Sequence, residues 1–245
     1  MDAVRQFEAL KKESIEQLGS DEKLAQLSQD WTNQSLRKRY THNFTWMGRP
    51  IIQFPQDIIA IQELIWRIQP DVIVETGIAH GGSLVFSASM LELLGGERKV
   101  VGVDIDIRAH NREAIEAHPM FKRITMIEGS SIASDVVDQV KAECAGASTV
   151  MVILDSNHSH KHVLAELESY ASLVKSDSYL IVLDTVVEFL DDDVIGDRPW
   201  GKGDNALTAV DAYLATTDRF KIDHSMDNKL LVSAGPRGYL ECVKD

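Results

Sequence analysis

Five short apolar segments recur through the middle of the chain, each followed by a stretch with helical periodicity. Strands made almost entirely of Val, Ile and Leu are buried on both faces, as in a parallel sheet covered by helices. We therefore predict a doubly wound, mostly parallel α/β sheet of the Rossmann-like type, with ligands at the carboxyl ends of the strands. The predicted strands are DVIVETG, KVVGVDI, ITMIEGS, TVMVILD and SYLIVLD, and the predicted helices cover 83–94, 109–117, 132–144 and 160–175.

The segments on either side of this repeat extend the predicted fold. Residues 1–18 carry apolar side chains at helical spacing and predict an amphipathic helix, whereas 31–55 lack periodicity and predict an irregular pocket wall. Pro55 suits the first turn of a helix that ends before Pro70. A helix over 207–214 and strands at RFKID and KLLVSA would complete a sheet of seven strands. We predict a helical and irregular extension over 1–54 and one ligand-binding domain over 55–245.

Charge and composition exclude several classes of partner. The net charge is -13 with a pI near 5.0, and no basic stripe is present, which disfavours nucleic-acid binding. No run of about 18 apolar residues predicts a membrane span, and the first residues are charged, without the apolar core of a signal peptide. The two cysteines form no disulfide framework or metal motif. We predict a cytoplasmic protein without a membrane or nucleic-acid partner.

The segment ETGIAHGGS, residues 75–83, forms a glycine-rich turn between the first predicted strand and the helix after it. Gly77 and Gly81 can adopt positive φ and admit a ligand close to the backbone, while the helix amides point into the same space. The spacing is not the G-x-G-x-x-G of a dinucleotide site, because Ile78, Ala79 and His80 follow Gly77. The turn is also compatible with a purely structural role.

Polar residues follow the next two strands and describe a nucleoside-shaped pocket. Asp104 is placed to accept hydrogen bonds from ribose hydroxyls, and Ser130 with Ser131 can meet an adenine edge. Each of these residues could instead cap a helix. Taken together, they favour S-adenosylmethionine, because an adenosine and a zwitterionic tail would fit without a pyrophosphate site.

Two carboxylates, Asp155 and Asp184, end the fourth and fifth strands and predict a site for Mg²⁺, which prefers oxygen ligands. Such an ion would lower the pKa of a substrate hydroxyl. His158 is a candidate general base or substrate contact, if it reaches that hydroxyl. His160 and His162 are read as the polar first turn of a helix, and a zinc site is disfavoured because further ligands are lacking.

Three segments together resemble the cephalosporin hydroxylase and rhamnosyl O-methyltransferase family: YTHNFTWMGRPIIQFPQDIIAIQELIWRIQPDVIVETGIAHGGS, LDSNHS and RPWGKGDNALTAV. The likeness runs from about Trp31 to the C-terminus. It implies a class I methyltransferase fold that shares its sheet and metal site with catechol O-methyltransferase, and S-adenosylmethionine-dependent O-methylation in natural-product or glycolipid tailoring.

The resemblance also implies roles for individual residues. Asp155 and Asp184 would hold the metal, with Asp155 also beside the cofactor. One departure concerns Leu183, since the family's fifth strand is expected to end in two adjacent acidic residues. Thr185, Asn157 or a water could fill that place. The remaining residues implied are Glu75, Gly77, Gly81 and Ser83 at the cofactor tail, Asp104 at the ribose, and Ser130 and Ser131 at the adenine.

The loop over 187–205 contains three glycines and predicts a mobile lid that Arg198 and Trp200 would close over the substrate, although a solvated surface loop is the alternative.

We expect an O-methyltransferase for a hydroxyl of a small natural product or sugar, assisted by Mg²⁺ and assembled as a homo-oligomer. Two alternatives remain open: a protein that binds S-adenosylmethionine without methyl transfer, and a nicotinamide-dependent dehydrogenase.

Overall fold

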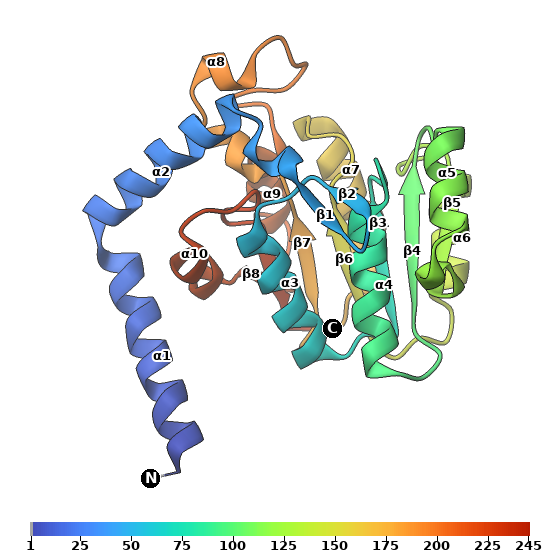
Figure 1. The fold of residues 1–245 in the computed structure, drawn as a ribbon, viewed down its shortest axis with the longest axis horizontal. Helices are drawn as coiled ribbons and strands as arrows, with labels where there is room; N and C mark the ends of the chain where they lie inside the picture. The colour runs from blue at the N-terminus through green and yellow to red at the C-terminus, as the bar shows by residue number, and fades with distance from the viewer. Residues whose placement is uncertain (1) are drawn as a thin grey trace.

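The computed structural model describes residues 2–245 and contains a central sheet of seven strands (Figure 1). The strand order is β5-β4-β3-β6-β7-β9-β8; β3 to β7 run parallel, and β9 is antiparallel to both of its neighbours. The predicted α/β fold is confirmed. The strands are β3 Val72–Thr76, β4 Lys99–Asp104, β5 Ile124–Glu128, β6 Val150–Leu154, β7 Tyr179–Val182, β8 Phe220–Ile222 and β9 Tyr239–Cys242.

Helices cover both faces of this sheet and bury two separate cores (Figure 1). Alternate residues of a strand point to opposite faces, so Ile73 joins the first core while Val72 and Val74 join the second. The first core packs under α3 Pro55–Ile68, α4 Gly82–Leu94, α5 Ala109–Glu116 and α10 His224–Leu230. The second packs under α6 Ser134–Glu143, α7 His160–Tyr170 and α9 Ala206–Leu214.

The N-terminal part is more ordered than the sequence indicated. The predicted first helix is present as α1 Ala3–Ser20, but α2 Glu22–Arg37 continues through Trp31, so the prediction of an irregular segment from that residue was wrong. A hairpin of β1 Phe44–Trp46 and β2 Arg49–Ile51 follows the 3₁₀ turn Tyr40–Asn43. Trp46 stacks edge-on against Phe86 and donates a 3.0 Å hydrogen bond to Ser89, which fastens the hairpin to α4.

The predicted strand KLLVSA was also wrong, because residues 229–230 end α10 and the last strand is β9. Leu231 turns the chain with a φ of 60°. Asp57, at the start of α3 and fully buried, then accepts hydrogen bonds from Ser233 Oγ (2.6 Å) and the Ala234 amide (2.7 Å). This side chain binds the Ala234 amide, which a strand could have paired with a neighbouring strand, an effect that local sequence does not reveal.

The remaining elements are short and lie in the connections. They are the 3₁₀ turns Pro119–Arg123, Ala171–Leu173 and Thr185–Phe189, and α8 Asp192–Ile195. Within residues 2–245, the helices lack the length and apolar character needed to cross a membrane. The strand order reverses between β3 and β6, where Thr76 pairs with Leu154. Gly77 and Asp155 are thus the first residues beyond neighbouring strand ends.

Candidate functional site

Three hollows lie side by side at the carboxyl edge of the sheet and share residues. The first, about 280 Å³, is lined by Asp104, Ser130, Ser131 and the loop after β6. The second, about 50 Å³, lies along the glycine turn and includes Ser83, while the third, about 520 Å³, lies over Asp184. Gly77 borders the first and second hollows and Asp155 the second and third. The three hollows are therefore neighbours along this edge of the sheet.

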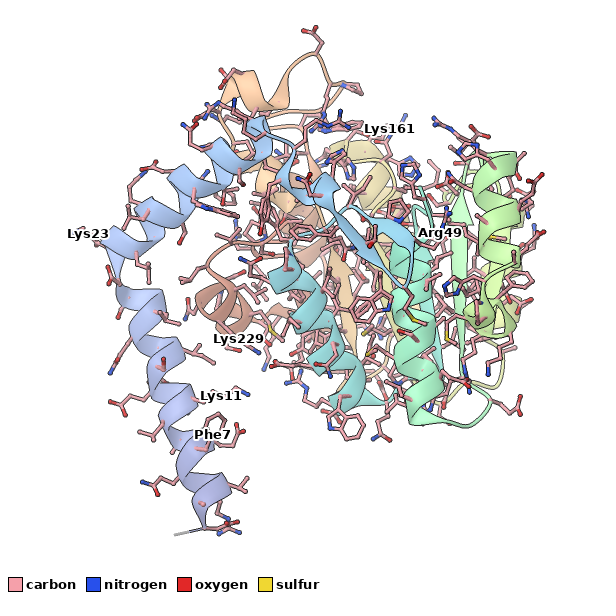
Figure 2. All side chains as sticks on the ribbon, in the orientation of Figure 1. Phe7, Lys11, Lys23, Arg49, Lys161 and Lys229 are labelled. Atoms are coloured by element: carbon pink, nitrogen blue, oxygen red, sulfur yellow. The ribbon has the colours of Figure 1, made fainter. Side chains whose placement is uncertain are left out.

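The glycine turn between the first two hollows is held from outside by the N-terminal hairpin. Arg49 donates to the His80 carbonyl at 2.9 and 2.6 Å and to Asn111 Oδ1 at 3.1 Å, and Asn111 donates to the Ala79 carbonyl at 2.9 Å. Figure 2 shows Arg49 reaching from the hairpin toward the start of α4. This clamp could not be predicted from the sequence, because Arg49 and Asn111 lie 31 and 32 residues along the chain from the groups they bind.

Gly77 has no room for a side chain. Its φ is +92°, and a Cβ there would lie 2.1 Å from the Asp155 carbonyl oxygen. Gly81, at φ +79°, caps α4 and faces Ile115 instead. The predicted glycine ledge is therefore built by close contact between β3 and β6 at the switch point.

Replacing Gly77 by alanine should destabilise the fold by at least about 2 kcal/mol, from left-handed backbone strain plus the collision with Asp155. Urea unfolding measures the change. Gly48→Ala is the control, since Gly48 has a φ of +86° but none of the described residues lies within 4 Å of the added Cβ. Equal losses in the two variants would show that the collision is relieved without cost.

Glu75 lies beneath the ledge, 2% exposed, and accepts a hydrogen bond from Ser83 Oγ. Its Oε2 is buried and has no hydrogen-bond partner within residues 2–245. Burial raises the pKa of Glu75 to about 7, and the Ser83 hydrogen bond offsets only part of that rise. A buried acceptor without a donor is costly, so this oxygen is suited to a cationic or N–H-bearing ligand.

Asp104 faces the first hollow but is already engaged by backbone. One carboxylate oxygen accepts from the Ile78 amide at 2.8 Å and the Ala79 amide at 3.1 Å, and the other accepts from the Asp106 amide at 3.1 Å. The carboxylate thus shapes the glycine turn. A carboxylate oxygen can accept two hydrogen bonds, so the oxygen bonded to Asp106 retains capacity for a ribose hydroxyl.

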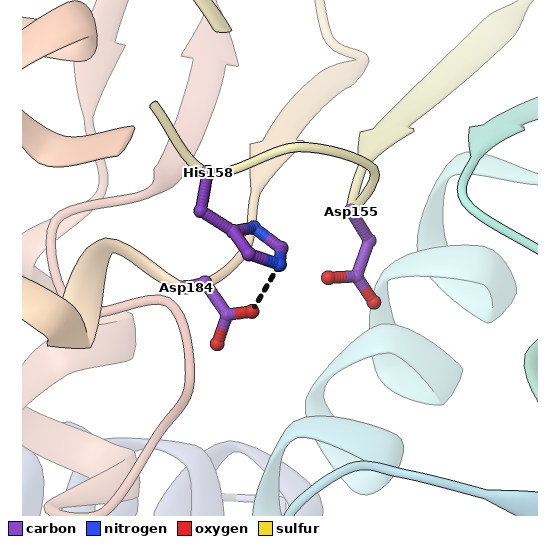
Figure 3. A group of neighbouring side chains, drawn as sticks. All are labelled: Asp155, His158 and Asp184. Carbon is purple, nitrogen blue, oxygen red and sulfur yellow. Dashed lines mark ion pairs between the residues drawn. The ribbon is translucent and has the colours of Figure 1, made fainter. Parts of the chain in front are cut away.

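Asp155, His158 and Asp184 converge beneath the third hollow (Figure 3). One ligand atom from each lies within 4.8 Å of the others, and His158 Nε2 is 2.9 Å from Asp184 Oδ2. Asp184 has a left-handed φ of 55°, unusual for a residue other than glycine. The fold brings together the two carboxylates and the histidine predicted for this site.

The pKa values of the two carboxylates are shifted in opposite directions. Burial and the Asp184 charge raise the pKa of Asp155 well above its usual range, whereas His158 outweighs burial and lowers the pKa of Asp184. Burial alone would lower the pKa of His158, but the two carboxylates raise it to about 9. His158 is therefore protonated at neutral pH in this arrangement. Its positive charge lies where the two carboxylates would also stabilise a metal cation.

The donor set fits a divalent cation despite Leu183, which is buried. Of the groups considered as replacements, Thr185 Oγ1 donates to the Pro236 carbonyl at 2.6 Å, and Asn157 Oδ1 accepts from Ser159 at 3.0 and 2.7 Å. His158 lies within reach of the same ion but could bind it only through a deprotonated ring nitrogen. Carboxylates suit Mg²⁺ and Mn²⁺, and an imidazole extends the set toward transition metals.

The third hollow is closed by the predicted lid and by the N-terminal segment. Trp200 packs edge-on against His158 at 4.9 Å, and its Nε1 is buried without a partner in the described chain. Arg198 also lines the hollow, as do Phe54 and other residues of the expected pocket wall. The lid is fastened rather than free, because Arg37 bonds to Asp191 and Asp193 at 2.7 Å.

Comparison with known proteins identifies the family. The family described as rhamnosyl O-methyltransferase/CmcI matches residues 38–243. The chain belongs to this family. The rhamnosyl O-methyltransferase of Mycobacterium tuberculosis (strain ATCC 25618 / H37Rv) is 29% identical over 228 residues, which cover 86% of this chain and 85% of that protein. The predicted family and the predicted class of enzyme, an O-methyltransferase, are confirmed.

Solved structures agree with the fold of this rhamnosyl O-methyltransferase/CmcI family member. CmcI with Mg and SAM superposes with a TM-score of 0.58 at 20% identity, covering 82% of this chain and 77% of the other. An O-methyltransferase from Bacillus cereus in complex with SAH gives a TM-score of 0.54 at 16% identity, covering 89% and 90%. At these identities the likeness establishes the class I methyltransferase fold alone.

Proposed function

We propose that this chain is an S-adenosylmethionine-dependent, Mg²⁺-assisted O-methyltransferase for a hydroxyl of a small natural product or sugar. The observation that carries the proposal is the adjacency of the three hollows, which share Gly77 and Asp155 as lining residues. A nucleoside, an amino-acid tail and an acceptor can then lie in one line, so that alignment supplies much of the rate enhancement. The cofactor and ion are also those of the solved CmcI structure.

The cofactor would be held by the residues predicted for it. Ribose hydroxyls meet Asp104, the adenine lies against Ser130 and Ser131, and the tail ammonium takes the unpartnered Oε2 of Glu75. Ser83 and Gly81 shape the tail hollow through the Glu75 hydrogen bond and the start of α4. A buried carboxylate opposite an ammonium forms a charge-assisted hydrogen bond, the stronger kind.

The acceptor would lie in the third hollow, with its hydroxyl beside Asp155, His158 and Asp184. When bound there, a divalent cation lowers the pKa of that hydroxyl. Transfer breaks the bond between sulfur and methyl carbon, forms the bond from that carbon to the acceptor oxygen, and releases the hydroxyl proton. His158 can receive this proton only after it has lost its own, because its pKa is about 9 in the present arrangement.

The lid contributes a donor and excludes water. Trp200 Nε1 would donate a hydrogen bond to an acceptor molecule, and Arg198 lines the same hollow. We further propose that residues 1–54 are an extension whose later part completes this wall for the domain over 55–245, since Phe54 lines the hollow.

Calorimetric titration of the nucleotide-free protein with S-adenosylmethionine, in EDTA and again in Mg²⁺, tests the function. We expect micromolar binding, about -8 kcal/mol, in both buffers. Release of S-adenosylhomocysteine across a panel of hydroxylated acceptors should depend on Mg²⁺ or Mn²⁺. Binding without release in any metal would favour the non-transferring alternative. Binding of NADH in place of S-adenosylmethionine would favour the dehydrogenase, which the absence of G-x-G-x-x-G already disfavours.

We also propose a cytoplasmic homo-oligomer. Both cysteines are buried free thiols, as in a reducing compartment, and α1 carries exposed Val4, Phe7 and Leu10 at 66%, 64% and 58%. Figure 2 shows Phe7 on α1, away from the sheet. An apolar stripe of this kind is suited to a second copy of the chain. Light scattering after size exclusion would test the assembly, and a monomer would refute it.

A further inference from the structure

Four polar side chains form a compact network behind the wall of the nucleoside hollow. Glu166, on α7 and fully buried, accepts from Ser131 Oγ at 2.5 Å and from Ser156 Oγ at 2.6 Å through the same oxygen, Oε1. His162 Nε2 lies 3.0 Å from Ser131 Oγ and 3.3 Å from Ser156 Oγ. Ser131, Ser156 and His162 line the hollow, whereas Glu166 lies behind them.

The carboxylate determines the direction of these hydrogen bonds. In the structure both serine hydroxyls donate to Glu166 Oε1, which accepts both hydrogen bonds. Their oxygens then offer only lone pairs to any other group. His162 Nε2, which contacts both oxygens, must accordingly carry its proton and donate to them. Ser131 and Ser156 therefore present hydrogen-bond acceptors to the hollow.

The other oxygen of Glu166 indicates that the carboxylate is not kept for stability. Oε2 is buried, and none of the residues the structure describes offers it a hydrogen bond. A buried carboxylate with an unsatisfied oxygen costs free energy. The function of Glu166 is consequently expected at its other oxygen, Oε1, whose two serine partners line the hollow.

We propose that Glu166 is a positioning residue that makes this site specific for a 6-aminopurine. With Ser131 and Ser156 restricted to accepting, the exocyclic amine of adenine is matched, whereas the 6-oxo group of hypoxanthine would bring one acceptor against another. The inference rests on the proposed function, because it requires that the hollow hold the nucleoside of the cofactor. It adds Glu166, Ser156 and His162 to the residues that govern recognition.

A glutamine at position 166 should reverse the polarity of the wall. Its amide nitrogen would find no partner at the Oε2 position and would turn toward the serine oxygens as a donor. The hydroxyl hydrogens of Ser131 and Ser156 would then be free to face the ligand. The Glu166→Gln variant should accordingly lose affinity for the 6-amino compound and gain affinity for the 6-oxo compound.

The test is calorimetric titration of the full chain with S-adenosylhomocysteine and with S-inosylhomocysteine, its 6-oxo analogue. We expect the unmodified protein to prefer the adenosyl compound by about a hundredfold or more, as expected for a site that hydrogen-bonds its ligand. Glu166→Gln should reduce this ratio at least about tenfold, with no fall in the thermal midpoint. Glu168→Gln, on the exposed side of the same helix, is the control and should keep the ratio.

A ratio that stays the same in Glu166→Gln would overturn the inference while leaving the cofactor assignment intact. If that variant does not fold, Ser156→Ala gives a second measurement. Loss of this acceptor should weaken the adenosyl compound more than the inosyl one, and equal losses would count against the proposal. Failure of the unmodified protein to bind S-adenosylhomocysteine would instead refute the proposed function, and this inference with it.

Discussion

Replacing Asp155 by asparagine should lower methyl transfer at least about a thousandfold, the range expected when a group that binds the ion and helps to position the proton acceptor is lost. Asp155 belongs to the candidate metal cluster and raises the pKa of His158. It also borders both the tail hollow and the acceptor hollow. Turnover measured as release of S-adenosylhomocysteine, at saturating cofactor and metal, checks the expectation.

Binding of S-adenosylmethionine to the Asp155→Asn variant in EDTA should stay within about threefold, because the tail and nucleoside contacts are intact. Asp138→Asn, an exposed change on α6, is the control and should leave both quantities unaltered. Turnover within tenfold of the unmodified protein would remove Asp155 from the proposed machinery. A parallel loss of cofactor affinity would mean that the residue serves the cofactor rather than the acceptor.

Replacing Glu75 by glutamine should stabilise the ligand-free protein above pH 7. The pKa of Glu75 rises from 4.5 to about 7 on burial, so the folded state favours the protonated carboxyl. Its contribution to stability is thus full below pH 4.5 and is lost as the pH rises through about 7, at a cost of up to about 3 kcal/mol. Urea unfolding from pH 5 to 8 should show a smaller decline for Glu75→Gln.

The same change should weaken S-adenosylmethionine binding about a hundredfold, as when one partner of a buried charge pair is removed. Ionisation of Glu75 also predicts that the affinity of the unmodified protein improves about fivefold from pH 6 to pH 7, and that the variant shows no such gain. A Glu75→Gln protein that binds as tightly as the original would place the ammonium elsewhere. Together, the two measurements would show that Glu75 lowers the stability of the ligand-free protein and is needed for tight cofactor binding.

Much of the fold was readable locally, because buried parallel strands need continuous apolar runs. The five strands from β3 to β7 and the helices between them lie where periodicity predicted. The failures came where a distant side chain replaced a backbone partner. Asp57 converts the end of KLLVSA into a turn, and α2 extends through Trp31 in a segment rich in polar and aromatic residues.

The candidate site likewise contains residues that the sequence predicts and residues that only the structure reveals. Strand ends are visible in a sequence, so Asp104, Asp155 and Asp184 could be named from their positions, and the family resemblance added Glu75. Residues from distant segments that hold or orient the binding-site residues could not be named in this way. The Arg49 clamp on the turn and the Glu166 network behind Ser131 join segments 31 and 35 residues apart.

By itself, the sequence determined the sheet, its ligand-binding edge and the chemical types of the residues there, because hydrophobic burial and strand order follow from local pattern. Only the tertiary structure decided the protonation and the hydrogen-bond partners of these residues. It placed His158 beside Asp184 and raised the pKa of His158, and it left Glu75 and Glu166 each with a buried oxygen that has no partner among residues 2–245. Desolvation and charge coupling depend on which groups meet in three dimensions, and no local pattern in the chain records those meetings.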